Sequence, residues 1–385
     1  MPDFVVYGTA VWDAPWLTEH NLAHALARKH RVLFVEPPVT PLTPLRYGLT
    51  RSSVEHARRL ARRPLRRAGR LHALRLLAVP PVEHPGARRL SAPLLRRQVR
   101  RAVRRLGLRE PVVIAARGMV ELEGAAAERA SVFLVKDLLE AGSQLLGRDG
   151  GRVVDEENRM CEAADVVCVV TRRLQERFAE RGFDSVVLPH GFHAELAPLY
   201  DAAEPPPEYA PLQRPLLGYA GRIDGRLDFE ALAALADRFA GGSIVLIGPV
   251  SPRLPTDAIA TLQARPNVHL FGTRRREELP AYLRYLDCCL MPYREDEWGK
   301  HGSPLKLWDA LYAGPPVVGS GYVTLLDHPL VRYATPPARL PDVVSAALAD
   351  GPREAEVRRR YALENTWDER ANDLESLLAE RLGVA

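Results

Sequence analysis

The chain has 385 residues, which is more than a single hydrophobic core usually organises, so its length predicts two domains. Hydrophobic residues make up 46% and charged residues 26%, as in a globular protein, and no apolar run approaches the roughly 20 residues of a membrane-spanning helix. The formal net charge is +5, but only four of the 53 basic residues are lysines. Because arginine fills positions where lysine is common, its abundance is no argument for nucleic acid, and no such partner is expected.

The cysteines and the N-terminus bear on metal binding and location. The four cysteines lack the paired spacing of zinc ligands, so we expect buried free thiols and no metal site. The opening MPDFVVYGTA enters a strand-like run without the basic and apolar regions of a signal peptide. We therefore expect a cytoplasmic protein, with peripheral attachment to the inner face of the membrane as an alternative.

Short, continuously apolar runs recur along the first 200 residues, with helical or polar segments between them. Continuous rather than alternating hydrophobicity is typical of strands that are buried on both faces. The pattern predicts an N-terminal Rossmann-like domain over residues 1–200, with a parallel sheet. Its expected strands are residues 4–8, 31–37, 111–116, 131–135, 165–170 and 185–189.

The rhythm restarts after a Pro-rich acidic stretch, residues 201–215, which we expect to be a linker. A second Rossmann-like domain is predicted over residues 216–362, and an amphipathic helix with Thr366 as its N-cap over residues 363–385, crossing back to the first domain. The predicted fold class is α/β, with two parallel-sheet domains facing across a cleft. The expected strands of the second domain are residues 216–221, 243–248, 267–272, 287–293 and 315–320.

Residues 51–109 contain many arginine pairs. From residue 91 to 106, Leu95, Val99, Ala102 and Leu106 share one helical face and arginines occupy the other. Either this is an ordinary solvated face, which the arginine bias favours, or it is a basic surface that approaches anionic phospholipid or a lipid-linked acceptor.

The stretch HGSPLKLWDALYAGPPVVGS, residues 301–320, combines a helix start with charged side chains. Ser303 is expected to cap a helix that begins with Pro304 at its first position, followed by Leu305, and the unpaired N–H groups at the start of a helix attract anions. Lys306 then reaches a phosphate, and Asp309 accepts ribose hydroxyls. The alternative is a plain helix cap with a solvated lysine and a surface carboxylate.

Two predicted strands end beside this stretch, in LGYAGRIDG with Arg222 and in LIGPV. Ligands of open α/β sheets bind at such strand ends. The ordered segments GYAGRI, IVLIGP, NVHLFG, ELPAYLRYLDCCLMPY and SPLKLWDALYAGPPVV resemble the donor-binding domain of GT-B glycosyltransferases, in particular the family 4 group, from residue 216 to about 320. The first domain is similar to that group more weakly, through WDAPWLTEHNLAHALARKHRVLFVEPP.

The resemblance implies that Arg222 and Lys306 contact the diphosphate of a UDP-sugar and Asp309 its ribose. It further implies that the backbone of Gly272, Thr273 and Arg274 contacts the uracil, without a metal or other cofactor.

Three features depart from the family pattern. His301 stands where the family has a glutamate for the donor sugar, and the shorter Asp309 replaces the ribose-binding glutamate. The lysine that follows the GR motif is also absent, with Arg226 nearest. Diphosphate binding is therefore implied more firmly than sugar preference, and Glu295 and His301 are the candidates for contacting the sugar.

Candidates for acceptor binding lie in the first domain. Gly8, Thr9, Trp12 and Trp16 follow the first strand, where an acceptor would approach, although such tryptophans also pack between domains.

Three residues are candidates for catalysis. Asp13 and His20 are candidates for orienting an acceptor hydroxyl. Asp137, at the end of a buried strand, either accepts the acceptor proton or caps the next helix.

Together these features predict a glycosyltransferase that moves a sugar from a UDP-sugar to a hydroxyl or amine. The acceptor is a natural product or glycan, either a small molecule or lipid-linked, and the resemblance favours retention at the anomeric carbon. The alternatives are a GT-B UDP-sugar epimerase and a non-enzymatic basic binding protein.

Overall fold

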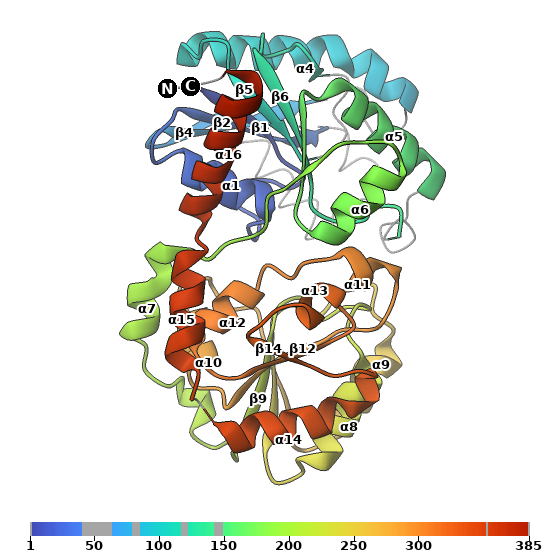
Figure 1. The fold of residues 1–385 in the computed structure, drawn as a ribbon, viewed down its shortest axis with the longest axis vertical. Coiled ribbons are helices and arrows are strands. Elements are labelled where there is room, and N and C mark those ends of the chain that lie inside the picture. The colour runs from blue at the N-terminus through green and yellow to red at the C-terminus, as the bar shows by residue number, and fades with distance from the viewer. Residues whose placement is uncertain are drawn as a thin grey trace. The chain divides into compact units, whose positions relative to one another are not determined.

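The structure is a computed structural model and describes residues 2–40, 64–78, 85–116, 122–141, 149–351 and 353–383. The chain forms two compact units, one of Met1–Pro189 with Arg370–Ala385 and one of His190–Glu369, here called unit 1 and unit 2. Each unit contains one sheet with helices packed against it (Figure 1).

Unit 1 is built on a sheet in the order β3-β4-β2-β1-β5-β6-β7-β8. All neighbouring strands are parallel except β3 and β4, which are antiparallel. Its elements are β1 (Phe4–Tyr7), α1 (Thr18–Leu26), β2 (Val32–Val39), β3 (Leu65–Ala68), β4 (Leu71–Leu77), α4 (Pro85–Leu106), β5 (Val112–Ala115), β6 (Ala130–Val135), α5 (Gly150–Ala163), β7 (Val166–Val169), α6 (Arg172–Glu180) and β8 (Val186–Val187).

The central strands of unit 1 are buried along their whole length, as their apolar runs predict. In β1, Val5 is in register with Leu33 of β2 and Val113 of β5. Helix α4 contacts β2 and β4, and its predicted apolar face is confirmed because Leu95, Val99 and Ala102 belong to the core.

Unit 2 has a six-stranded, wholly parallel sheet in the order β11-β10-β9-β12-β13-β14. The strand order reverses between β9 and β12. Sheets of this kind bind ligands at such a reversal, beyond the carboxyl ends of the strands. Its elements are α7 (Ala197–Asp201), β9 (Leu216–Ala220), α8 (Phe229–Arg238), β10 (Ser243–Ile247), α9 (Thr256–Gln263), β11 (Val268–Gly272), α10 (Leu279–Arg284), β12 (Cys288–Pro292), α11 (Glu297–His301), α12 (Leu307–Ala313), β13 (Val317–Ser320), α13 (Val323–Leu326), β14 (Val331–Tyr333), α14 (Leu340–Asp350) and α15 (Ala355–Glu364).

The chain enters and leaves unit 2 at neighbouring points. Phe192 N donates to Asn365 O at 2.8 Å, and Trp367 N donates to Phe192 O at 2.9 Å. Helix α16 (Trp367–Leu382) starts here, and Thr366 caps it as predicted, accepting from Glu369 N at 3.2 Å.

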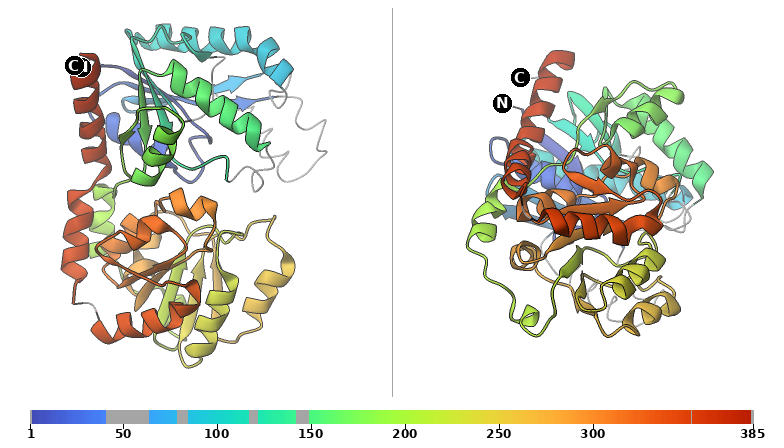
Figure 2. Two further views of the ribbon diagram at one scale, coloured as in Figure 1. Left: turned by 45° about the vertical axis from the view of Figure 1, so that its right-hand side comes forward. Right: turned by 60° about the horizontal axis from the view of Figure 1, so that its bottom comes forward.

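Beyond residue 369, α16 belongs to unit 1. Its Glu375 lies 3.5 Å from Nζ of Lys29 and 3.1 Å from Nε2 of His30. Near the end of the helix, Arg381 pairs with Asp184 at 2.8 Å. The red helix can be followed along its length in Figure 2.

Two expectations need correction. Residues 201–215 are not a free linker, because they belong to unit 2 and bury Tyr209, whose hydroxyl donates to Tyr282 O at 3.0 Å. The β3–β4 hairpin was not anticipated, because its arginines obscure the alternation of strand residues.

Other expectations hold. The four cysteines are buried and unpaired, as expected. No helix in the described ranges is both long and apolar enough to span a bilayer.

Gly8, at the end of β1, allows a close approach to the core. A Cβ placed there would lie 2.2 Å from Cζ of Phe34, a fully buried ring. We expect Gly8→Ala to destabilise unit 1 by about 1–3 kcal/mol through overpacking, as measured by urea unfolding. Gly151→Ala, in α5 of the same unit, is the control and should be neutral or slightly stabilising; equal stability of both variants would contradict this account.

Candidate functional site

The candidate site of unit 2 lies at the carboxyl end of β9, beside the switch point of the sheet. Its centre is the ammonium of Lys306, which donates to the hydroxyl of Tyr219 at 2.5 Å and lies 4.2 Å from the centre of that ring. The Tyr219 hydroxyl in turn donates to Arg222 O at 3.0 Å. Tyr219 thus links the Lys306 side chain to the backbone of Arg222, and the diphosphate-binding roles of these two residues stay predictions.

Two glycines make room for this arrangement. A Cβ on Gly221 would lie 2.0 Å from Nζ of Lys306, and a Cβ on Gly248 would lie 2.0 Å from Gly221 O. Both glycines have positive φ, +153° and +143°. Backbone hydrogen bonds from Gly221 N to Ile247 O and from Gly248 N to Gly272 O, both 2.8 Å, join the ends of β9, β10 and β11.

Positive charge exceeds negative charge around Lys306. Arg226 forms a bidentate pair with Asp224, at 2.9 and 2.8 Å. Burial alone would raise the pKa of Asp224, but the hydrogen bonds and charge of Arg226 lower it. That pair leaves Lys306 and the exposed Arg222 without a carboxylate partner among the described residues.

The pKa of Lys306 is lowered to about 7, first by desolvation and then by the charge of Arg226, with Asp224 opposing. This holds although part of the side chain remains exposed. An anion placed beside this lysine would favour its charged form. The arrangement is therefore suited to binding a negatively charged group.

The segment before α12 differs from the prediction. The helix begins at Leu307 rather than Pro304, with Lys306 as its N-cap, so Ser303 does not cap it. A turn precedes the helix, with Leu307 N donating to Pro304 O at 3.0 Å. In the described part of the chain, the N–H groups of Leu305 and Lys306 have no acceptor, so they remain available next to the Lys306 side chain.

Asp309 lies one helical turn beyond Lys306, as the spacing predicts. Its Oδ1 accepts from the Tyr200 hydroxyl at 3.3 Å. Burial raises the pKa of Asp309, and the nearby positive charge of Arg276 partly offsets this effect. The sequence alone did not single out Tyr200 or Arg276, because each reaches Asp309 from another element of unit 2.

The predicted uracil-binding segment follows β11. Gly272 and Thr273 are exposed, and Gly272 has a φ of +67°. The guanidinium of Arg274 instead serves the fold, donating to the Tyr282 hydroxyl at 2.7 Å and to Glu208 at 3.1 Å. Gly272 and Thr273 are therefore open to a base, whereas the side chain of Arg274 is engaged within unit 2.

The two candidates for the donor sugar lie in and before α11. Glu295 is exposed. His301 is half-buried, and its Nδ1 lies 3.1 Å from Glu297 O. These observations assign no sugar-binding role to either residue, so both assignments stay predictions.

In unit 1, a charge cluster that the sequence did not predict lies after β1. Glu19 is fully buried; its Oε1 accepts from Thr9 N at 2.9 Å and its Oε2 from Lys136 at 2.6 Å. Lys136 also donates to the Thr9 hydroxyl at 2.7 Å. Burial alone would raise the pKa of Glu19, but the charge and hydrogen bonds of Lys136 and Thr9 hold it at about 2.

His20 and Asp13 are both engaged within unit 1. His20 is fully buried; its Nδ1 accepts from Leu17 N at 3.3 Å and its Nε2 lies 3.1 Å from Val11 O, so no ring atom is left for an acceptor. Burial also lowers the pKa of His20. Asp13 is exposed and pairs with Arg66 at 2.7 Å.

The predicted aromatic loop is held together by ring contacts. Trp12 and Trp16 lie 5.0 Å apart, and Trp12 also packs edge-on against Phe34. Both tryptophans are half-buried within unit 1. Asp137 follows β6, next to Lys136, and is half-buried with an interaction partner. Its catalytic assignment stays a prediction.

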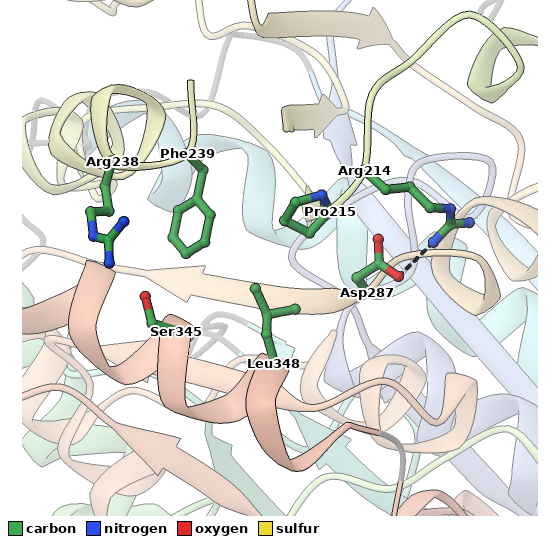
Figure 3. A pocket seen from close by; sticks show the side chains of 7 residues that line it. All are labelled: Arg214, Pro215, Arg238, Phe239, Asp287, Ser345 and Leu348. Atoms are coloured by element: carbon green, nitrogen blue, oxygen red, sulfur yellow. Dashed lines mark hydrogen bonds and ion pairs between the residues drawn. The ribbon is translucent and has the colours of Figure 1, made fainter. Parts of the chain in front are cut away.

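An open hollow in unit 2 lies at the other edge of the sheet (Figure 3). Pro215 and Asp287, which line it, precede β9 and β12, so it opens at the amino ends of the strands. Arg214 and Asp287 form an ion pair there at 2.5 Å. This hollow is separate from the site around Lys306.

Comparisons with known proteins relate a large part of unit 2 to glycosyltransferases. Residues 214–348 match the family model for glycosyl transferases group 1. A putative teichuronic acid biosynthesis glycosyltransferase of Bacillus subtilis (strain 168) is 31% identical over 105 residues, which are 27% of this chain and 26% of the relative. The match therefore spans about a quarter of the relative's length. The predicted resemblance is confirmed for the segment that carries Arg222, Lys306 and Asp309.

Solved structures match the whole chain. Anabaena HepE, in complex with UDP and glucose, has a TM-score of 0.66 at 15% identity and covers 100% of both chains. An α,α-trehalose-phosphate synthase (UDP-forming) from Burkholderia xenovorans, in complex with glucose-6-phosphate, has a TM-score of 0.67 at 14% identity, over 98% of this chain and 100% of the other. These likenesses confirm the GT-B fold.

The Glu19 cluster predicts an acid-dependent loss of stability. The pKa of Glu19 is about 2 in the folded chain against a usual 4.5, so its contribution is present above pH 4.5 and is lost as the pH falls toward 2. The full shift corresponds to about 3 kcal/mol. We expect Glu19→Gln to be less stable at pH 7 and to lose less stability than the unchanged chain between pH 6 and pH 3, as measured by urea unfolding.

Asp13→Asn is the matched control, because it removes an exposed carboxylate from the same unit. Its effect should stay within about 1 kcal/mol and leave the acid dependence unchanged. The same acid dependence in Glu19→Gln as in the unchanged chain would refute the assignment of that loss to Glu19.

Proposed function

We propose that the protein is a glycosyltransferase that takes a sugar from a UDP-sugar and passes it to a hydroxyl or amine of an acceptor. The observation that carries the proposal is the Lys306 ammonium, which among the described residues donates only to the neutral Tyr219 hydroxyl and lies close to the Arg222 backbone at the end of β9. The match of this segment to glycosyl transferases group 1 supports it.

The proposed roles of the cations follow from the charges that develop when the donor is cleaved. When the bond between the sugar and the diphosphate breaks, negative charge grows on the departing phosphate and positive charge on the sugar ring. Fixed cations and N–H groups beside the phosphate stabilise that transition state more than the ground state. In this proposal Lys306 and Arg222 supply the charge, and no metal or other cofactor takes part.

The nucleoside is assigned to the neighbouring groups. The carboxylate of Asp309 accepts hydrogen bonds from the ribose, and the backbone of Gly272 and Thr273 contacts the base. Glu295 and His301 are proposed to contact the donor sugar. In unit 1, Trp12, Trp16 and Asp137 are proposed to bind a natural-product or glycan acceptor, and the family resemblance favours retention at the anomeric carbon.

Removing the central cation should weaken donor binding. We expect Lys306→Ala to raise the Kd for UDP-glucose roughly ten- to hundredfold, because a charged hydrogen bond to the diphosphate is lost. Arg222→Ala should act in the same direction. Isothermal titration calorimetry measures both effects, and mass spectrometry of acceptor mixtures then measures transfer.

Arg339→Ala removes one charge from an exposed position of unit 2 and should leave the Kd unchanged. Unaltered affinity and turnover in Lys306→Ala would refute the proposed donor site. Turnover of the donor sugar without any acceptor would indicate an epimerase instead.

Donor affinity should depend on pH through Lys306. Its pKa of about 7 in the free protein means that the ammonium is mostly charged at pH 6 and mostly neutral at pH 8. Above pH 7, Lys306 must take up a proton from the solvent when the anion binds, so affinity for UDP-glucose should fall by up to about tenfold per pH unit.

Titration calorimetry of UDP-glucose between pH 6 and pH 9 measures this fall. Lys306→Arg keeps its charge throughout this range and should abolish the slope. The same slope in Lys306→Arg and in the unchanged chain would exclude Lys306 as the titrating group.

A further inference from the structure

The outer face of α4 carries an exposed stripe that the proposed function does not use. Leu90 and Leu94 are 73% and 40% exposed, and one to three turns further along the same helical face lie Arg97, Arg101 and Arg105. The opposite face packs into unit 1, so this face points away from the sheet (Figures 1 and 2).

The apolar end of the stripe continues onto the sheet. Leu77, the last residue of β4, is 39% exposed. The amide of Gln98 donates to Leu77 O at 2.8 Å and to Leu94 O at 3.3 Å, so the end of β4 lies beside this part of α4. Leu90 and Leu94 lie one turn apart on α4, and these two exposed residues together with Leu77 are here called the α4 patch.

The other end of the stripe is strongly cationic. Arg97, Arg100, Arg101, Arg104 and Arg105 are all exposed. Within the described residues these five form no ion pair, and α4 itself contains no acidic residue. Arg96, by contrast, turns inward and donates to Glu123 O. Most exposed arginines of α6, α15 and α16 have a carboxylate nearby, so the α4 set is distinctive in its excess charge.

We propose that this face of α4 docks on an anionic lipid surface, with the α4 patch entering the headgroup region and the arginines contacting lipid phosphates. A helix that lies in the membrane interface combines aliphatic side chains, which leave water, with cations, which pair with anionic headgroups. Charge complementarity selects this occupant, because an apolar protein partner would leave five arginines unpaired. The inference does not depend on the donor site.

Vesicle co-sedimentation of the full chain tests the proposal. We expect binding to vesicles of phosphatidylcholine mixed with phosphatidylglycerol and little binding to phosphatidylcholine alone, with the difference falling as salt rises. Arg97→Glu with Arg101→Glu should lower the partition coefficient roughly tenfold or more. Leu90→Ser with Leu94→Ser should also lower it severalfold.

Each double variant has a matched control. Arg172→Glu with Arg238→Glu makes the same change in net charge at exposed positions elsewhere, and Leu326→Ser with Leu363→Ser removes exposed leucines of unit 2. Both controls should bind vesicles as the unchanged chain does, and circular dichroism should show that all four variants are folded.

Four results would overturn the proposal. The first is no preference of the unchanged chain for anionic vesicles. The second is an equal loss of binding in the arginine variant and its control, which would reflect net charge alone. The third is unchanged binding of the leucine variant. The fourth is binding to nucleic acid through the same arginines without binding to vesicles.

Discussion

When both faces of a parallel sheet are buried, polar side chains can reach the sheet only at the ends of its strands. This constraint determines where the charged groups of both units lie. The central strands β9 and β12 of unit 2 carry no charged side chain, and Lys306 meets the sheet where β9 ends. In unit 1, Glu19 and Lys136 meet beyond the ends of β1 and β6 for the same reason. Because the carboxyl ends of parallel strands share one edge, residues far apart in the sequence become neighbours there.

The two lysines at these edges illustrate opposite outcomes of desolvation. Lys136 contacts the buried carboxylate of Glu19 at 2.6 Å, so its charge is matched within the protein and serves mainly to fix the Thr9 loop. Among the described residues, Lys306 donates to a neutral hydroxyl and forms no ion pair, and the nearby Asp224 is already paired with Arg226. The charges of Glu19 and Lys136 therefore compensate each other, whereas the charge of Lys306 is left to pair with an incoming anion.

Sequence patterns predicted what depends on local order. Continuous apolar runs predicted the central strands, and the spacing of Lys306 and Asp309 placed both on one helical turn. Contacts between distant elements could not be predicted in the same way. Nothing local in the sequence distinguishes Glu19, or indicates that Lys136 reaches it across 117 positions. The start of α12 was misplaced because Ser-Pro is only a statistical helix signal, whereas the Pro304 turn decides it.

The paired crossing at Phe192 and Asn365 makes unit 2 an insertion into unit 1 whose two ends meet on one β-bridge. Gly191 keeps the bridge tight, since a Cβ there would lie 2.6 Å from the Thr366 backbone. Recombination at these two junctions, which are neighbours in space, therefore exchanges the whole of unit 2 and leaves unit 1 unchanged. A scaffold of that kind lets one half acquire a new specificity while the other keeps its own.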